Sequence, residues 1–159
     1  MSDTKSRTGK LSFTSGDFDQ AKYAGVSQNA KLSELRLISV DYKASTEALF
    51  NSLHELSPKF SFEGSASAFD FSNEDGRVFG VYEWVAAVKA GRKNAIRSKC
   101  RYLLVYSGLQ NHDPEYVKLY FEKIGRFASY PYFRAQFASD VASSGVFLPP
   151  LPSLTERVD

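Results

Sequence analysis

The chain has 159 residues, of which 43% are hydrophobic and 24% are charged, and this composition excludes a disordered chain, a collagen-like repeat and a coiled coil. Twenty Lys and Arg residues against 18 Asp and Glu residues give a net charge of +2, too close to neutrality to indicate nucleic acid or a membrane as the default partner. The single cysteine, Cys100, cannot form an internal disulfide, and no signal peptide or spanning segment is visible. We therefore expect a cytoplasmic protein without direct membrane insertion.

Phe and Tyr dominate the apolar residues, with 13 Phe and 9 Tyr against one Trp and one Met. Aromatic rings bury large areas, so they fill a core or form a recognition surface. The composition alone leaves both interpretations open.

The first part of the chain, residues 1–30, is polar, and we expect a flexible N-terminal arm with one short ordered piece. A folded domain is expected over residues 31–154, followed by a short tail at 155–159. Dense Leu, Ile and Val between Leu35 and Tyr42 predict a strand. Helical spacing then predicts a helix over Thr46–Leu56, ended by Pro58.

Three more strands are predicted over residues 60–71, 77–88 and 95–107 because apolar side chains alternate there. The turns between them contain Gly76 and Gly91, which can adopt positive φ. Short connections of this kind join antiparallel neighbours, so the pattern predicts an antiparallel meander.

The C-terminal third has helical periodicity. Asp113 is a suitable N-cap, Pro114 is tolerated at the first helical position, and apolar residues then recur at helical spacing. We expect Pro131 to interrupt this helix and Gly145 to end a second run. The proline-rich stretch at 146–154 should be extended. The fold class predicted is α+β: a four-stranded antiparallel meander with a long broken helix packed on or beside it.

Residues that would carry enzymatic chemistry are scarce. His54 and His112 lie in different predicted elements, and neither has metal-ligand spacing with Cys100 or a carboxylate. Phosphate-binding glycine loops, dinucleotide fingerprints and nucleophile elbows do not occur. We expect no enzyme activity, no metal and no cofactor, and we interpret Cys100 as a small buried hydrophobic residue.

One stretch of 13 residues, from Lys89 to Arg101, contains six basic residues and no acidic residue. A nucleic-acid or adaptor surface would use such a patch, with Tyr102 or Tyr106 for stacking. Alternatively, the charges solvate a strand face and block edge-to-edge aggregation, which we favour because the aromatic signature of sheet-based RNA readers is absent. The basic residues are Lys89, Arg92, Lys93, Arg97, Lys99 and Arg101.

A more specific motif follows at the C-terminal end. Residues 130–134 read Tyr-Pro-Tyr-Phe-Arg, and Ser143, Gly145 and Phe147 follow in fixed register. This motif resembles the signature around the main helix of the SecB family of export chaperones: aromatic-Pro-Tyr-x-Arg, a helical stretch, then Ser-x-Gly-x-Phe-Pro. The order of predicted elements over residues 32–152 also agrees with that family.

The resemblance implies an ATP-independent holdase that binds unfolded or aggregation-prone polypeptides in aromatic-lined grooves and assembles as a homotetramer, a dimer of dimers. It also implies the site residues: Phe60, Phe62, Tyr132, Phe137 and Phe147 for the client-binding groove, and Phe133, Gln136 and Asp140 for the oligomer interface. Pro58, Phe60 and Phe62 resemble the start of the family's groove strand. An aromatic surface suits many clients because burial of apolar area is non-directional.

The sequence also departs from the family. SecB export chaperones are acidic and contact the SecA motor through an acidic sheet surface, whereas this chain has a pI of about 8.6. Asp41 matches one acidic position, but Lys43, Ala44 and Ser45 do not supply a second carboxylate. These departures speak against coupling to SecA, so the resemblance leaves two roles open: protein export, or holding a dedicated client such as the antitoxin of a toxin–antitoxin system. Two rivals remain: a nucleic-acid or adaptor module using Lys89–Arg101, and a structural oligomerisation domain.

Overall fold

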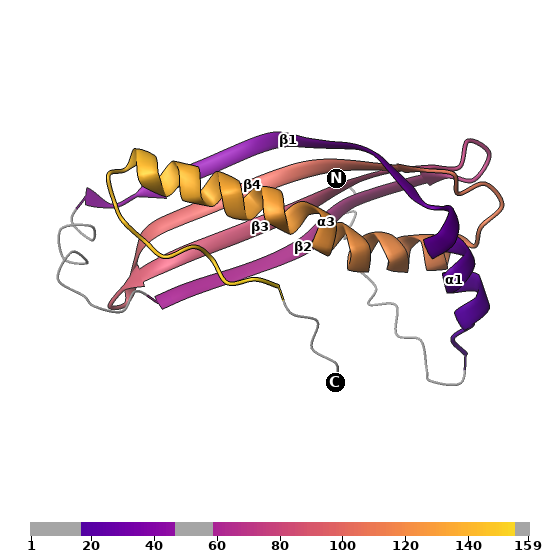
Figure 1. Ribbon diagram of the computed structural model, residues 1–159, viewed down its shortest axis with the longest axis horizontal. Helices are drawn as coiled ribbons and strands as arrows, with labels where there is room; N and C mark the ends of the chain where they lie inside the picture. Colours follow the sequence, from indigo (N-terminus) through magenta and orange to yellow (C-terminus); the bar gives the residue numbers. More distant parts are fainter. Residues whose placement is uncertain (1–16, 47–58, 155–159) are drawn as a thin grey trace, which may run out of the picture.

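The computed structural model describes residues 17–46 and 59–154. Its elements are α1 (Gln20–Asn29), β1 (Lys31–Ala44), β2 (Lys59–Ser72), β3 (Arg77–Ala90), β4 (Lys93–Ser107) and α3 (Pro114–Ser143). The strands form one antiparallel sheet in the order β1-β4-β3-β2, and α3 crosses one face of it (Figure 1). The predicted α+β meander is confirmed. The helix predicted over Thr46–Leu56 lies, after its first residue, outside the described residues.

The turns of the meander have the glycine geometry that the sequence predicts. Gly76 joins β2 to β3 with φ +68°, and Gly91 joins β3 to β4 with φ +67°. Side chains with a Cβ are disfavoured in this left-handed region. Alternation along each strand then sends one set of side chains toward α3 and the other set to the open face of the sheet.

The core lies between the sheet and α3. Trp84 is fully buried, and its Nε1 donates a hydrogen bond of 2.8 Å to Ser129 Oγ, which in turn donates to the carbonyl oxygen of Gly125 at 2.6 Å. A buried polar group needs such a partner. The helix-facing residues of the central strands form the middle of this core: Val78, Tyr82, Trp84, Ala86 and Val88 from β3, and Ile96, Cys100, Tyr102, Leu104 and Tyr106 from β4.

Helix α3 is one continuous helix of 30 residues, so the predicted break at Pro131 is wrong. Pro131 lacks an N–H group, which leaves the carbonyl group of Phe127 without its helical partner. Pro131 lies on the exposed side of the helix, where water can solvate that carbonyl group. Both predicted ends are confirmed: the Asp113 carboxylate accepts from the N–H of Glu115 at 3.0 Å, and Gly145 follows the last turn with φ +72°.

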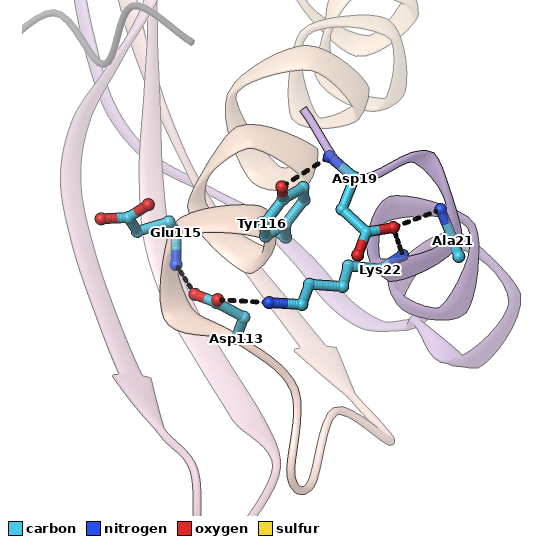
Figure 2. A network of polar contacts seen from close by, with 6 residues as sticks. All are labelled: Asp19, Ala21, Lys22, Asp113, Glu115 and Tyr116. Atoms are coloured by element: carbon cyan, nitrogen blue, oxygen red, sulfur yellow. Dashed lines mark hydrogen bonds and ion pairs between the residues drawn. The ribbon is translucent and has the colours of Figure 1, made fainter. Parts of the chain in front are cut away.

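The first stretch of the chain contains one short helix, because residues 20–29 form α1 against the beginning of α3. Figure 2 shows how polar contacts join them: the N–H of Asp19 donates to Tyr116 Oη at 2.8 Å, and Lys22 pairs with Asp113 at 3.6 Å. The side chain of Asp19 also caps α1. Apolar periodicity did not reveal this helix, since Val26 is its only buried residue.

Candidate functional site

Strand β2 places two predicted groove residues on the helix side of the sheet. Phe60 and Phe62 lie opposite Val88 and Ala86 of β3, whose side chains are buried beneath α3. Both phenylalanines are half-buried, and the ring of Phe62 stacks on Tyr130 of α3 with 5.4 Å between centroids. β2 is an edge strand, so this aromatic contact lies at the border of the core.

After α3 the chain turns back beside the helix, and we call residues 146–154 the strap (Figure 1). The strap is fixed by its backbone: Arg134 Nε donates to the carbonyl oxygen of Leu151 at 2.7 Å, and the Tyr130 hydroxyl group donates to the carbonyl oxygen of Pro152. The Leu151 side chain is buried. Prolines have no N–H group to satisfy, so a strap anchored through its carbonyl groups suits this proline-rich sequence.

Burial raises the pKa of the Tyr130 hydroxyl group, while the nearby Arg134 guanidinium lowers it. The net direction is upward, so Tyr130 stays protonated at neutral pH and keeps its proton for the strap. Burial likewise raises the pKa of the Cys100 thiol, which is consistent with an unreactive core residue.

Two apolar pockets lie along the helix and the strap, which we call the strap pockets. The first, of about 420 Å³, is lined by Phe137, Ala138, Val141, Ala142, Gly145, Val146, Phe147, Leu148, Pro149, Pro150 and Leu151. The second, of about 460 Å³, is lined by Phe127, Tyr130, Pro131, Arg134, Ala135, Ala138, Pro150, Ser153 and Leu154. Volumes of this size suit large apolar side chains.

Four of the five predicted groove residues lie on or beside this surface. Phe147 is fully exposed at the first pocket, and Phe137 is buried beneath it. Phe62 reaches the second pocket through Tyr130, and Phe60 precedes it on the same strand face. Tyr132 is exposed and lines neither of the two strap pockets. Its assignment to the groove stays a prediction.

The three residues predicted for the oligomer interface differ in how far they are exposed. Phe133 is fully buried and stacks on Trp84 at 5.8 Å, so its side chain has no surface for a second copy. Gln136 and Asp140 are only partly buried, and Gln136 Nε2 donates to Asp140 Oδ1 at 3.1 Å. Tyr132, 58% exposed, shares their flank of the helix by its spacing of four residues from Gln136.

This flank of α3 faces the side of β1. Tyr42 of β1 hydrogen-bonds Ser144 at 2.7 Å, which fixes β1 beside the end of the helix. Leu37 and Val40 pair with the buried Tyr102 and Cys100, so their side chains point to the helix side of the sheet. Yet Leu37 and Val40 are 40% and 42% exposed. The outer strand β1 thus presents apolar side chains that α3 does not cover.

The basic residues divide into two groups. Lys99 and Arg101 lie near Glu83 of β3, with ion pairs of 3.5 and 3.7 Å. This carboxylate offsets their charge, so the middle of the open face is mixed rather than basic. Lys89, Arg92, Lys93 and Arg97 are exposed at the β3–β4 hairpin and form no ion pair with another described residue.

Sequence reasoning missed the strap contacts and two basic residues. Arg134 and Tyr130 belong to the predicted motif, but their side chains donate hydrogen bonds to backbone carbonyl groups, which every residue has. Lys43 and Lys59, from two other strands, lie at the same end of the sheet as the basic hairpin. Strand register could have revealed this group, because Lys59 pairs with Lys89 and Lys43 with Arg97.

Comparison with solved structures identifies the fold. The chain is similar to the SecB-like chaperone Rv1957 of Mycobacterium tuberculosis, solved in complex with a ChAD peptide from the HigA1 antitoxin. The TM-score is 0.70 at 14% sequence identity, covering 87% of this chain and 100% of that chain. The resemblance seen in the sequence is confirmed in the architecture: the chain has a SecB-like fold.

Comparison of the sequence itself adds no relative, since no family model and no curated protein matches it. In the described part of the chain, no helix is long and apolar enough to cross a membrane.

Proposed function

We propose that this protein is an ATP-independent chaperone that holds unfolded or aggregation-prone polypeptide segments at the strap pockets. The observation that carries this proposal is the apolar surface between the strap and α3, where Phe147 is fully exposed within a SecB-like fold. Holding requires no catalytic group, since the binding energy comes from apolar burial. The proposal therefore includes neither enzyme activity nor a cofactor, and it places the protein in the cytoplasm.

The proposed client is a dedicated one, an antitoxin that aggregates when unbound. Support comes from the similar protein, which was solved with an antitoxin peptide. A pocket for one or two large side chains is better matched to a defined segment than to a broad set of sequences. Transfer of clients to SecA is not part of this proposal, because Lys99 and Arg101 lie on the open face beside Glu83.

We further propose that a second copy of the chain covers the apolar side chains of β1, as a step toward a homotetramer. Leu32, Leu37 and Val40 are each at least 40% exposed on this outer strand. Exposed apolar side chains along an edge strand are an aggregation hazard unless something covers them. Gln136 and Asp140 on the adjacent flank of α3 supply polar groups for the same contact. The mass measured by light scattering after size exclusion tests this part.

The holdase proposal is tested by aggregation of reduced insulin, followed by light scattering with and without the protein. Phe147→Ser removes an apolar ring that is fully exposed, so the fold should be unaffected. Loss of that ring should weaken capture about tenfold, in line with the burial energy of one phenylalanine side chain. Capture by the wild-type chain should persist at high salt, because apolar burial is not screened.

Phe79→Ser is the matched control, because Phe79 is 47% exposed on the open face of the sheet, away from the strap. It should leave capture unchanged. Equal losses in both variants would contradict the assignment to the strap pockets. Failure of the wild-type chain to suppress aggregation would contradict the holdase proposal itself and leave a structural oligomerisation domain as the explanation.

A further inference from the structure

Six basic side chains gather where β1 and β3 end and where β2 and β4 begin, and we call this group the cationic end. Lys59 of β2 pairs with Lys89 of β3, and Lys43 of β1 pairs with Arg97 of β4. The other two, Arg92 and Lys93, lie at the turn between β3 and β4. All six residues are exposed.

The nearest acidic side chains of the described strands on the open face, Asp41 and Glu63, lie one row farther along the sheet and form no ion pair with the six cations. The ranges 43–46, 59–61 and 87–97 contain no Asp or Glu, and none of the six cations has an ion pair with a described residue. Like charges directly opposite each other on paired strands destabilise a sheet. The arrangement therefore works against stability, unlike the pairing of Lys99 and Arg101 with Glu83 farther along the sheet.

Protection of a sheet edge does not explain the cluster. Charged residues on outer strands discourage edge-to-edge pairing, and this reason applies to Lys43 and Lys59. Lys89 and Arg97 belong to the central strands β3 and β4, which are paired on both sides. Their charge protects no free edge, so edge protection does not account for it.

The cationic end adjoins the surface that the proposed function assigns to clients. Lys59 immediately precedes Phe60 in the edge strand β2, and the β3–β4 turn lies at the same end of the molecule as the end of α3, from which the strap departs (Figure 1). An extended chain advances about 3.3 Å per residue. A segment lying against Phe60 and Phe62 thus reaches the cationic end within about two residues.

We propose that the cationic end binds an acidic polypeptide segment that lies next to the apolar segment of the client. This inference rests on the proposed function and specifies its client: apolar residues for the strap pockets, joined to a run of Asp or Glu. Charge complementarity of this kind accelerates encounter and selects among partners more than it adds affinity. The client would be recognised by two different chemistries on adjoining parts of one surface.

A single-stranded nucleic acid suits this end less well. Proteins that bind single strands combine cations with aromatic side chains on which bases stack. The open-face row through Lys43 and Arg97 continues with Ala87 and Ser61, neither of which is aromatic. The aromatic rings Phe60 and Phe62 lie on the other face of β2, half-buried against the core.

Three peptides test the proposal, each with the same aromatic and aliphatic core and a flanking run of Glu, Gln or Lys. Binding is measured by fluorescence anisotropy at low and high salt. The Glu-flanked peptide should bind about tenfold more tightly than the Gln-flanked one at low salt, as several exposed ion pairs together provide, and the Lys-flanked peptide more weakly. High salt should make the three affinities converge.

The variant Lys89→Gln/Arg92→Gln/Lys93→Gln should abolish the preference for Glu and leave the affinity for the Gln-flanked peptide unchanged. The matched control Lys31→Gln/Arg77→Gln/Lys118→Gln removes the same charge at other positions and should keep the preference. A preference lost equally in both triple variants would reflect net charge and would overturn the proposal.

The remaining outcomes separate the two proposals. If all three peptides bind equally at low salt, the cationic end has no role in client choice and the proposed function stands. If none binds, the proposed function fails with it. A single-stranded oligonucleotide that binds more tightly than the Glu-flanked peptide, and loses its affinity in the first triple variant but not in the control, would overturn the proposal in favour of a nucleic-acid surface.

Discussion

The two ends of the sheet differ in how their charged groups are paired. At the end that carries α1, which we call the braced end, two aspartates have partners within the chain: Asp113 caps α3 and pairs with Lys22, and Asp19 caps α1 (Figure 2). At the cationic end, six basic residues have no ion pair with a described residue. The overall charge of +2 does not reveal this difference between the two ends.

The turns at the two ends also differ in packing. At the braced end, a Cβ on Gly76 would lie 2.6 Å from the backbone nitrogen of Gln110. At the cationic end, a Cβ on Gly91 would meet nothing within 4 Å. The turn at the braced end is packed against its neighbours, whereas the turn at the cationic end is open and carries cations that have no ion pair with a described residue.

The largest effect should come from alkaline pH, which acts on the buried tyrosines of the braced end. Burial raises the pKa of Tyr106 and of Tyr120 above the ordinary value of 10.0. When the folded-state pKa of a hydroxyl group is raised, the free energy of unfolding keeps its full value below the unfolded pKa and falls as the pH rises through the folded pKa. We therefore expect cooperative unfolding above pH 10, measured by circular dichroism alongside tyrosinate absorbance.

Tyr106→Phe isolates that contribution. The Tyr106 hydroxyl group is buried without a hydrogen-bond partner among the described residues, so its removal loses no bond and should stabilise the protein by about 1 kcal/mol at neutral pH. The alkaline midpoint should move upward. Tyr116→Phe provides the contrast, since it loses the hydrogen bond to Asp19 and should cost about 1 kcal/mol. A destabilised Tyr106→Phe variant would contradict this account of the braced end.

Two glycine substitutions compare packing at the two ends directly. A Cβ on Gly80 would lie 2.0 Å from Phe121 Cζ, so Gly80→Ala must displace a buried ring and should cost about 3 kcal/mol. Gly91→Ala meets no neighbour and suffers only the backbone penalty of φ +67°, about 1 kcal/mol. Urea unfolding measures both. Equal costs would show that the two ends are packed alike.

Much of the fold was predictable because alternation and turn glycines determine a meander locally. The prediction of a break at Pro131 failed because a proline on the exposed side of a well-packed helix is tolerated. Helix α1 was hidden for a different reason. It is held by contacts such as Asp19 to Tyr116, 97 residues apart in sequence, and such contacts leave no periodic signal.

The candidate site was predictable where a motif supplied its residues and not where the site depends on tertiary contacts. Phe62, Phe137 and Phe147 lie on or beside the strap pockets. Helical phase does not decide the case of Tyr132, because Ala135, three residues farther along the helix, lines the second pocket while Tyr132 does not. The return of the strap could not have been predicted, because the carbonyl groups that Arg134 and Tyr130 bind exist in every sequence.

Removal of the helix cap at the braced end should have an intermediate effect. Asp113→Ala leaves the N–H of Glu115 without its acceptor and Lys22 without its ion pair. The loss of an N-cap costs about 1 kcal/mol. Asp113→Asn keeps the capping oxygen and should recover most of that loss. If Asp113→Asn were as unstable as Asp113→Ala, the ion pair rather than the cap would hold α3 at this end.

The smallest effects should come from removing single charges, and their signs separate the two ends. Lys22→Gln loses a partly exposed ion pair and should cost about 0.5 kcal/mol. Lys89→Gln at the cationic end relieves repulsion from Lys59 and should stabilise the protein by a few tenths of a kcal/mol at low salt. Both differences should shrink at high salt because these charges are exposed. A loss of stability in Lys89→Gln would mean that this charge serves the fold, and the cationic end would no longer be free for an acidic client.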